Sequence, residues 1–497
     1  MEFENNLVNY EAFGAKGDGV TDDMQAICDA HAYANEHALD VRTDPRGTYY
    51  MGGKPLTTII ATNTDWSTSR FTIDDAAGVE NHRLSVFEIQ SLLEPEELSF
   101  KSLTRDQRQT NVRPERNCWV RVENENKRLY LRRGRNANQG VSQSDCFVLR
   151  RDGTIEGDID WEYDEVTGVE ALPIENETLS IRGGIFTTFA NRWQKEEGYE
   201  YWDRNIVISR SNTIVDGFTH YVVGETDIGS AYSGFLSASR CAHITFKDCW
   251  ATGHRTYEAM GRAGKPVSVG TYDYGANSVV GFTMSNCRQN HITDRTRWGV
   301  IGTNNCKNIL LEDCYLSRMD THMGVSGNYT IRRCTLGHVG LNAIGRGQLT
   351  VEDSTLYGRA LINFRSDYGS TWEGNVDIRN CKWIPACGDE CEPRMINVAN
   401  DGMHDFGYKC YMPEKITVDG LHVEDSNTPE GYEGMYYLAD PDDFYDGVNE
   451  VALTEDRVSP YATTKTLAVT NVETASGQSP KLSLSDRLCE SVQLTSD

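Results

Sequence analysis

The second half of the chain repeats a short pattern in which apolar and polar residues alternate and end on a cysteine or serine. Copies include HITFKDCW (243–250), NILLEDCY (308–315) and VDIRNCKW (376–383). Alternation with period two, together with many Val, Ile, Thr and Phe residues, predicts a β-strand for each copy. The shared position, which recurs at steps of 20 to 38 residues, is occupied by Cys249, Cys287, Cys314, Cys334, Ser354 and Cys381.

These steps predict a solenoid, in which each coil adds an equivalent strand and extra residues enter at a fixed corner. No helical pattern lies between the copies, so stacked parallel coils are expected. The repeated cysteine would then point inward as a small apolar side chain. Most of the 14 cysteines are therefore predicted to lie in the core rather than in a redox or metal site. Similar strands extend the repeat from about residue 175 to about residue 475.

The N-terminal segment YEAFGAKGDGVTDDMQAICDA (10–30) predicts a strand, a glycine-rich turn and a helix from about Asp23 to Glu36. Thr21 and Asp22 are expected to cap the start of this helix. The segment resembles the entry motif of right-handed parallel β-helix proteins of the pectate-lyase-like superfamily. The resemblance implies an all-β, single-stranded right-handed parallel β-helix with an N-terminal capping helix and a small β-rich insertion. It says little about the reaction, because enzymes and phage tailspikes share this fold.

The repeat and the segments that interrupt it give the expected organisation of the chain. Residues 88–175 lack the repeat and contain a locally basic stretch followed by an acidic one, as expected for a β-rich insertion. The predicted parts are an N-terminal cap with the first coils (1–87), the insertion (88–175), the main β-helix (176–475) and a C-terminal tail (476–497).

Composition and charge limit the partners that we expect. The chain has 48 Lys and Arg against 74 Asp and Glu, a net charge of −26, which argues against general nucleic-acid binding. No run approaches the roughly 20 apolar residues of a membrane helix, so a soluble protein is expected. The first residues lack the features of a signal peptide. The compartment is therefore cytoplasmic, or extracytoplasmic with a leader removed.

Counting forward from each ladder position predicts a patch of His, Arg, Asp and aromatic residues on one face. Coils stack at about 4.8 Å, so equivalent positions become neighbours. The predicted catalytic residues are His322, His338, Asp320, Arg365, Asp294 and Tyr368. The predicted substrate-binding residues are Arg295, Arg318, Trp298, His291, Arg346, Asp367 and Asn342.

A cationic patch on an acidic chain predicts an anionic ligand, and an acidic glycan is the expected substrate. In uronate β-elimination, arginines would neutralise the sugar carboxylate and a histidine or Tyr368 would transfer the proton. In hydrolysis, two of Asp294, Asp320 and Asp367 would flank the bond. The paired-Asp and Gly-His-Gly signatures of related hydrolases are absent, which favours elimination. A glycan-binding, tailspike-like module without catalysis is the remaining alternative.

No cofactor is expected. Calcium is conceivable from the resemblance, but the Asp cluster of the pectate lyases is not evident. CGDEC (387–391) with Cys410 is a weak zinc candidate, because a fourth ligand is not apparent. The protein is expected to be a monomer or a homotrimer.

Overall fold

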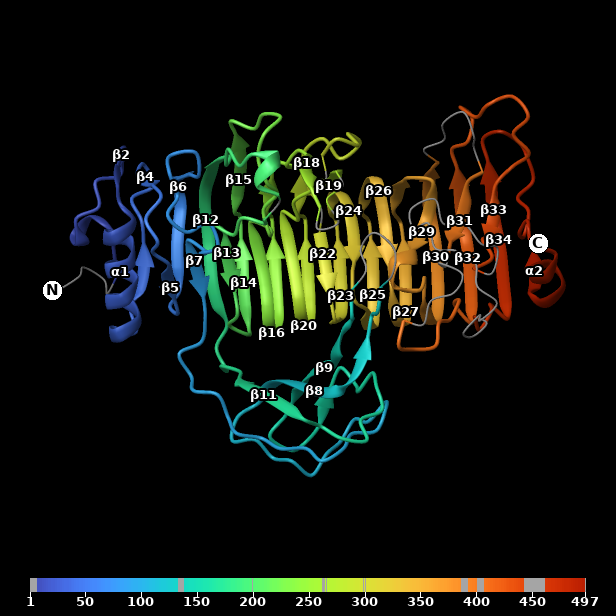
Figure 1. Ribbon diagram of the computed structural model, residues 1–497, viewed down its shortest axis with the longest axis horizontal. Helices are drawn as coiled ribbons and strands as arrows, with labels where there is room; N and C mark the ends of the chain where they lie inside the picture. Colours follow the sequence, from blue (N-terminus) through green and yellow to red (C-terminus); the bar gives the residue numbers. More distant parts are fainter. Residues whose placement is uncertain are drawn as a thin grey trace. The chain divides into compact units, whose positions relative to one another are not determined.

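The computed structural model is built from stacked parallel strands, and its described residues divide into two compact units. Unit 1 comprises residues 1–94, 173–301 and 315–317, and unit 2 comprises residues 95–172, 302–314 and 318–497. Within each unit the strands form coils of a right-handed parallel β-helix (Figure 1), which confirms the predicted fold class. The described residues are 7–132, 138–198, 200–261, 264, 266–297, 299, 301–385, 392–399, 406–441 and 461–496.

Unit 1 contains the first coils and the longer of the two α-helices found among the described residues. Two short strands, β18 and β19, form an antiparallel pair at one corner. The helices of unit 1 are η2 (Glu11–Phe13), α1 (Met24–His37) and η4 (Lys195–Glu197). Its strands are β1 (Leu7–Val8), β2 (Asp18–Asp22), β3 (Asp40–Arg42), β4 (Thr48–Met51), β5 (Thr58–Ile60), β6 (Thr64–Asp74), β7 (Phe87–Ile89), β12 (Leu179–Phe189), β13 (Ile206–Ile208), β14 (Thr213–Asp216), β15 (Thr219–Val223), β16 (Leu236–Lys247), β17 (Trp250–Ala251), β18 (Tyr257–Met260), β19 (Pro266–Val269), β20 (Tyr274–Ser285) and β21 (Arg288–Gln289).

Unit 2 contains the later coils together with an antiparallel sheet of four strands. The antiparallel strands are β8 (Cys118–Leu129), β9 (Val141–Leu149), β10 (Ile155–Glu156) and β11 (Gly168–Pro173). The coil strands are β23 (Cys306–Glu312), β25 (Val325–Arg332), β26 (Thr335–Ala343), β27 (Gly345–Glu352), β28 (Thr355–Tyr357), β29 (Ala360–Phe364), β30 (Trp372–Ile384), β31 (Arg394–Asn397), β32 (Lys415–Val423), β33 (Tyr436–Leu438), β34 (Thr466–Thr474) and β35 (Gln493–Ser496). Its helices are η5 (Ser366–Tyr368) and α2 (Asp486–Ser491). Three strands, β11, β22 (Ile301–Asn304) and β24 (Tyr315–Thr321), have residues in both units.

The helix α1 packs its apolar face onto the first coils of unit 1 (Figure 1). His31 on that face accepts or donates a hydrogen bond of 2.8 Å with Tyr10, which satisfies one polar atom inside the core. The predicted cap residues Thr21 and Asp22 lie in β2, and Asp23 is the N-cap residue, but the Asp22 carboxylate accepts a hydrogen bond of 3.1 Å from the backbone of Met24, the first helical residue. The Asp23 carboxylate accepts hydrogen bonds from the backbone of Lys16 and Gly17, so it fixes the preceding glycine turn.

The residue before each ladder position turns the chain with a positive φ. Asn and Asp tolerate this left-handed conformation better than most residues, which explains the recurring Asp-Cys and Asn-Cys pairs. The φ angles are 52° at Asp248, 52° at Asn286, 56° at Asp313, 49° at Arg333, 50° at Asp353 and 48° at Asn380.

The ladder residues themselves are buried and form the predicted inward row. Each thiol donates a hydrogen bond to the carbonyl two residues earlier, for example Cys334 to Arg332 at 3.1 Å. Ser354 makes the same bond to Glu352 at 2.7 Å, so a serine hydroxyl fits a position that cysteine otherwise occupies. The row continues in register as Leu421 and Val472, where an apolar side chain suffices.

The antiparallel sheet has a core of its own. Phe100, Leu103, Val120 and Phe147 are buried against one another within this cluster. The sheet therefore forms a satellite hydrophobic cluster of its own. No described helix is long and apolar enough to cross a membrane.

Candidate functional site

Asp320 at the end of β24 lies at the centre of a cluster of cationic side chains in unit 2. Arg365 donates a hydrogen bond to its Oδ2 at 2.7 Å, and His322 Nε2 lies 2.9 Å from the same oxygen. Arg318 also donates to Oδ2. The Asp320 side chain has no exposed surface, whereas 20% of Arg365 and 23% of His322 remain exposed. We call these four residues the Asp320 cluster.

The charges of the Asp320 cluster do not cancel. Burial alone would raise the pKa of Asp320, but Arg318 and Arg365, with the hydrogen bond from His322, outweigh burial and lower that pKa. Asp320 is therefore an anion at neutral pH, and two guanidinium groups surround it. The two arginines exceed the one carboxylate by one positive charge, which suits an anionic ligand at the exposed edge of the cluster.

The carboxylate of Asp320 also orients His322. An ionised carboxylate only accepts hydrogen bonds, so the Nε2 atom that faces it carries a proton. Nδ1 is then the basic nitrogen of a neutral imidazole. This is the arrangement by which a carboxylate fixes the tautomer of a general base.

Asn342 belongs to a row of hydrogen-bonded asparagines on three successive coils. Asn363 donates to Asn342 at 2.6 Å, and Asn397 donates to Asn363 at 2.7 Å. The strand register of β26, β29 and β31 aligns these positions. Side-chain amides that bond one another along the stack stabilise the coils.

Unit 2 also contains three other residues that the sequence predicted for the site: His338, Tyr368 and Arg346. His338 packs edge-on against Tyr357, with 5.5 Å between ring centroids. Tyr368 accepts a hydrogen bond from Arg132 at 3.3 Å, and its ring lies under that guanidinium. Arg346 pairs with carboxylates of residues 106 and 160, so it too contacts the inserted segment.

The remaining predicted site residues either lie in unit 1 or are not among the residues that the structure describes. Asp294 accepts hydrogen bonds from Thr296 and lies 3.6 Å from Arg297, as in an ordinary turn. His291 and Arg295 are exposed. Trp298 and the side chain of Asp367 lie outside the described residues, as does the segment 387–391.

A cavity of about 500 Å³ lies in unit 2 between the inserted sheet and the coils. Trp161, Tyr130 and Gln143 line it from the insertion, and Gly324 and Arg346 line it from the coils. Its volume is within the range of ligand pockets, roughly 300–1,000 Å³. We call it the insertion cavity.

On successive coils, some residues that line the insertion cavity come shortly after residues of the predicted site in the sequence. Gly324 comes two residues after His322, and Ile344 comes two residues after Asn342. Tyr368, three residues after Arg365, packs with Tyr130 and Ile344. Residues that line the cavity are therefore close in sequence to His322 and Asn342.

A buried lysine joins the two sides of the insertion cavity. Lys307 on β23 lies 2.7 Å from Asp145 and 3.1 Å from Asp160, both of the insertion. Burial raises the pKa of Asp145 to about 7 despite the lysine, and the two carboxylates raise the pKa of Lys307. We call these three residues the Lys307 cluster.

Sequence reasoning missed the Lys307 cluster. Counting from the ladder aligns coil with coil, but no periodicity relates the insertion to the coil that it contacts. The one signal in the sequence was Lys307 itself, a charged residue that directly follows Cys306 at the start of a predicted core strand.

Unit 1 holds a second buried charge network around His254. Its Nδ1 lies 3.3 Å from Glu225 and its Nε2 lies 3.7 Å from Asp273. Burial raises the pKa of Asp273 to about 7. His254 and Asp273 expose 1% and none of their side chains, so the network has little access to a ligand.

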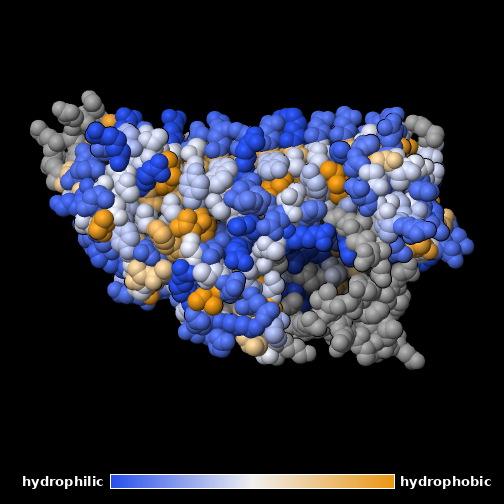
Figure 2. Space-filling view, turned by 90° about the horizontal axis from the view of Figure 1, so that it is seen from above, coloured by the Kyte–Doolittle hydropathy of each residue, from blue (hydrophilic) through white to orange (hydrophobic). Residues whose placement is uncertain are grey.

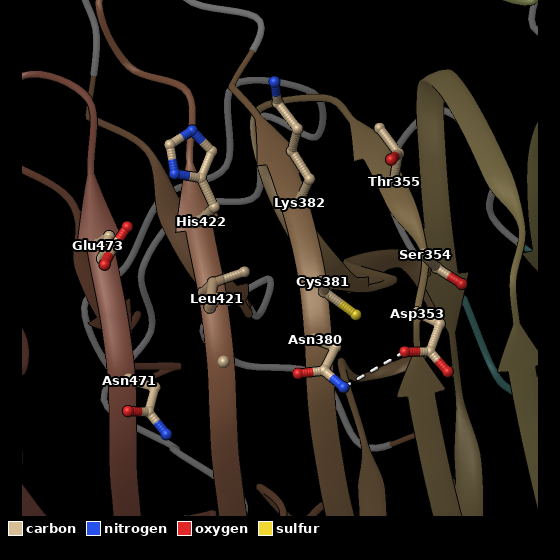
Figure 3. Close-up of a pocket in the computed structure, with 11 residues that line it drawn as sticks. Asp353, Ser354, Thr355, Asn380, Cys381, Lys382, Leu421, His422, Asn471 and Glu473 are labelled. Atoms are coloured by element: carbon tan, nitrogen blue, oxygen red, sulfur yellow. Dashed lines mark hydrogen bonds between the residues drawn. The ribbon is translucent and has the colours of Figure 1, made fainter.

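A shallow groove of about 370 Å³ runs over the outer corner of β28, β30, β32 and β34 (Figure 3). Asn380 donates to Asp353 at 3.4 Å across its floor. Lys382 and His422 both face Glu424, at 3.3 and 3.6 Å. Because its charges are already paired, this groove is a weaker site than the insertion cavity.

Among the described residues, no group of three His, Cys, Asp or Glu side chains is placed to hold a metal ion. Buried carboxylates at the candidate site are neutralised by Lys307, Arg318 and Arg365 instead. Arg365 and His322, both partly exposed, supply a cationic group that can bind an anion and an imidazole that can transfer a proton.

No family model matches the chain. A depolymerase of Klebsiella phage P510, described as specific for capsule KL64, is 32% identical over 94 residues. The match covers 17% of this chain and 9% of that protein.

Two solved structures are also similar. The tailspike protein gp49 of Pseudomonas phage LKA1 has 11% identity and a TM-score of 0.44, over 95% of this chain and 83% of that chain. The A-module of the mannuronan C-5 epimerase AlgE6 of Azotobacter vinelandii has 10% identity and a TM-score of 0.41, over 99% and 98%. At such identities the likeness concerns the fold alone.

Proposed function

We propose that the chain cleaves an anionic, uronate-containing polysaccharide by β-elimination at the Asp320 cluster. The observation that carries the proposal is the stoichiometry of this cluster, in which two arginines and one histidine meet a single buried carboxylate. A buried Asp320 fixes the cations in place before substrate arrives, so little reorganisation accompanies binding.

Each residue of the cluster has a role in this proposal. Arg318 and Arg365 neutralise the uronate carboxylate, which acidifies the C5 proton beside it. His322 takes that proton at Nδ1, while Asp320 acts as a positioning residue. The C5–H and C4–O bonds break, a C4–C5 double bond forms, and the leaving oxygen takes a proton from solvent or from a neighbouring acid.

The named relative supports the polysaccharide class and nothing finer. The Klebsiella phage protein is described as a capsule depolymerase, and capsules are polysaccharides. Since the match covers 17% of this chain, the polymer that it degrades is not carried over.

The test is a cleavage assay with polygalacturonate, alginate and hyaluronan. We expect ultraviolet absorbance from the unsaturated product, released together with new reducing ends, and loss of both in His322→Gln. The matched control is His422→Gln, another histidine beside a carboxylate but on the outer groove. Reducing ends without ultraviolet absorbance would reject elimination.

Glycoside hydrolysis is the second candidate, and the Lys307 cluster favours it. Asp145 and Asp160 face one cavity, and Asp145 has a pKa raised to about 7, as a general acid at neutral pH requires. Under this alternative, Asp145→Asn would abolish release of reducing ends and His322→Gln would not. Retention of polymer without any cleavage would instead favour a binding module.

A further inference from the structure

A strip of aromatic and cationic side chains crosses four strands of unit 1. Trp250 on β17 pairs in register with Arg288 on β21, and Arg288 pairs with Tyr315 on β24. Tyr221 on β15 extends the strip, because its ring lies 5.0 Å from the ring of Trp250. We call these four residues the aromatic strip.

The aromatic strip is accessible to solvent, with Arg288 exposed and Trp250 half-buried. Tyr221 and Tyr315 each expose 42% of their surface, which is unusual for such large rings. Figure 2 shows a mainly hydrophilic face on which hydrophobic residues gather in a few separate groups. Rings gathered on successive strands of one stack differ from the scattered apolar residues of an ordinary surface.

The backbone holds the strip in a fixed order. The amides of Trp250, Arg288 and Tyr315 donate to carbonyls of the adjacent coil at 2.8 to 2.9 Å. Parallel strands lie about 4.8 Å apart, so Trp250 and Tyr315 stand about 9.6 Å apart with the guanidinium between them. A linear polymer laid along the stack would meet ring, cation and ring in turn.

The cation in the strip can still accept an anionic partner. Arg288 contacts Asn286 through its Nε and Nη2 atoms at 3.4 and 3.2 Å. Among the described residues, no carboxylate lies within 4 Å of its guanidinium, although the chain has 74 acidic residues. The neighbouring Asp248 is already engaged by Lys247 and Asn286.

From this juxtaposition we infer that the aromatic strip is a second binding site for an anionic polysaccharide, distinct from the Asp320 cluster. The rings stack on the apolar faces of sugar residues, and Arg288 pairs with a carboxylate or sulfate. Naming the same polymer as the substrate rests on the proposed function. The strip would hold long chains on the protein between cleavage events.

The experiment uses the full chain with Trp250→Ala/Tyr315→Ala and, separately, Arg288→Gln. Arg182→Gln is the matched control, an exposed strand arginine whose Nε likewise donates to a side chain two residues earlier. Retention is measured by affinity electrophoresis in gels that contain polygalacturonate, alginate, hyaluronan or neutral dextran. Circular dichroism checks that each variant is folded.

We expect the double variant to bind the retained anionic polymer about tenfold more weakly, with no change in dextran. Arg288→Gln should weaken binding several-fold and Arg182→Gln should not. Cleavage of short oligosaccharides should be unchanged, whereas cleavage of polymer at low concentration should fall.

Each failure has a separate meaning. Wild-type protein that no anionic polymer retains, or strip variants that bind as well as wild type, would overturn the second site even if cleavage is normal. Strip-dependent retention without any cleavage would reject the proposed function and leave the strip intact. If the double variant changes the oligomeric state in sedimentation experiments, the strip is a contact between copies of the chain, and the inference is wrong.

Discussion

The Asp320 cluster and the Lys307 cluster of unit 2 have opposite charge stoichiometry. In the first, two arginines and a histidine share one buried carboxylate, and in the second, two carboxylates share one buried lysine. Arg365 and His322 of the first are partly exposed, whereas 1% of the Lys307 side chain is exposed. The first can therefore attract an anion, while the second joins two parts of the unit and keeps a protonatable carboxyl at the cavity.

The largest expected effect concerns the base of the Asp320 cluster. General acid–base catalysis typically contributes about 10²–10⁴-fold, so His322→Gln should lower kcat by about that factor. KM should change less, because Arg318 and Arg365 remain to bind the carboxylate. Steady-state kinetics by product absorbance checks this. Equal losses in His322→Gln and His422→Gln would remove the Asp320 cluster from the mechanism.

The next effect tests whether the Lys307 cluster joins the insertion to the coils. Lys307→Met leaves two buried carboxylates without their cation and should lower the free energy of unfolding by about 3–5 kcal/mol. Lys247 is the matched control, because it also faces two carboxylates, at 3.3 and 3.7 Å, but is half exposed. Lys247→Met should lower the free energy of unfolding far less, because solvent screens an exposed pair. Chemical denaturation that gives the two variants equal midpoints would contradict this role.

The two clusters should also respond to pH in opposite directions. The lowered pKa of Asp320 gives stability that is complete above its unfolded value of 3.8 and is lost as the pH falls below it. The raised pKa of Asp145 means that its carboxyl binds a proton more tightly in the folded protein. Stability is therefore lost as the pH rises from 3.8 towards about 7.

Denaturation midpoints between pH 3 and pH 8 check these signs. Asp320→Asn should remove the loss on the acid side, and Asp145→Asn should remove the loss towards neutral pH. Profiles that are parallel to wild type in both variants would mean that these groups do not set the pH dependence.

The smallest expected effect concerns the row of ladder cysteines in the core. Cys334→Ser should change the free energy of unfolding by less than about 1.5 kcal/mol, because Ser354 already makes the equivalent bond. Cys334→Val should cost at least as much, since it removes the donor. Thermal unfolding of both variants distinguishes a hydrogen-bonding ladder from a purely apolar one.

The coil architecture could be predicted because the ladder position and the residue before it recur in each coil for structural reasons. The left-handed residue before each ladder position favours Asn or Asp, and the inward position favours a small side chain, so both leave a mark in the sequence. Counting from the ladder also placed Arg318, Asp320 and His322 with Arg365, because equivalent positions on stacked coils become neighbours.

The same counting could not find the insertion cavity. Tyr368 and Arg346 were expected beside the histidines, but each contacts the inserted segment. The partners of Lys307 come from a different topology, an antiparallel sheet whose register is independent of the coil. Side chains that meet across two unrelated architectures leave no shared period in the sequence.

The position of the insertion in the chain has a consequence for synthesis. Arg105 of the insertion pairs with Glu373, 268 residues later, and both line the insertion cavity. At about 5–20 residues per second, roughly 13–54 s separate the translation of these two residues. The inserted sheet must therefore remain folded on its own core, or be protected by a chaperone, until the later coils emerge from the ribosome.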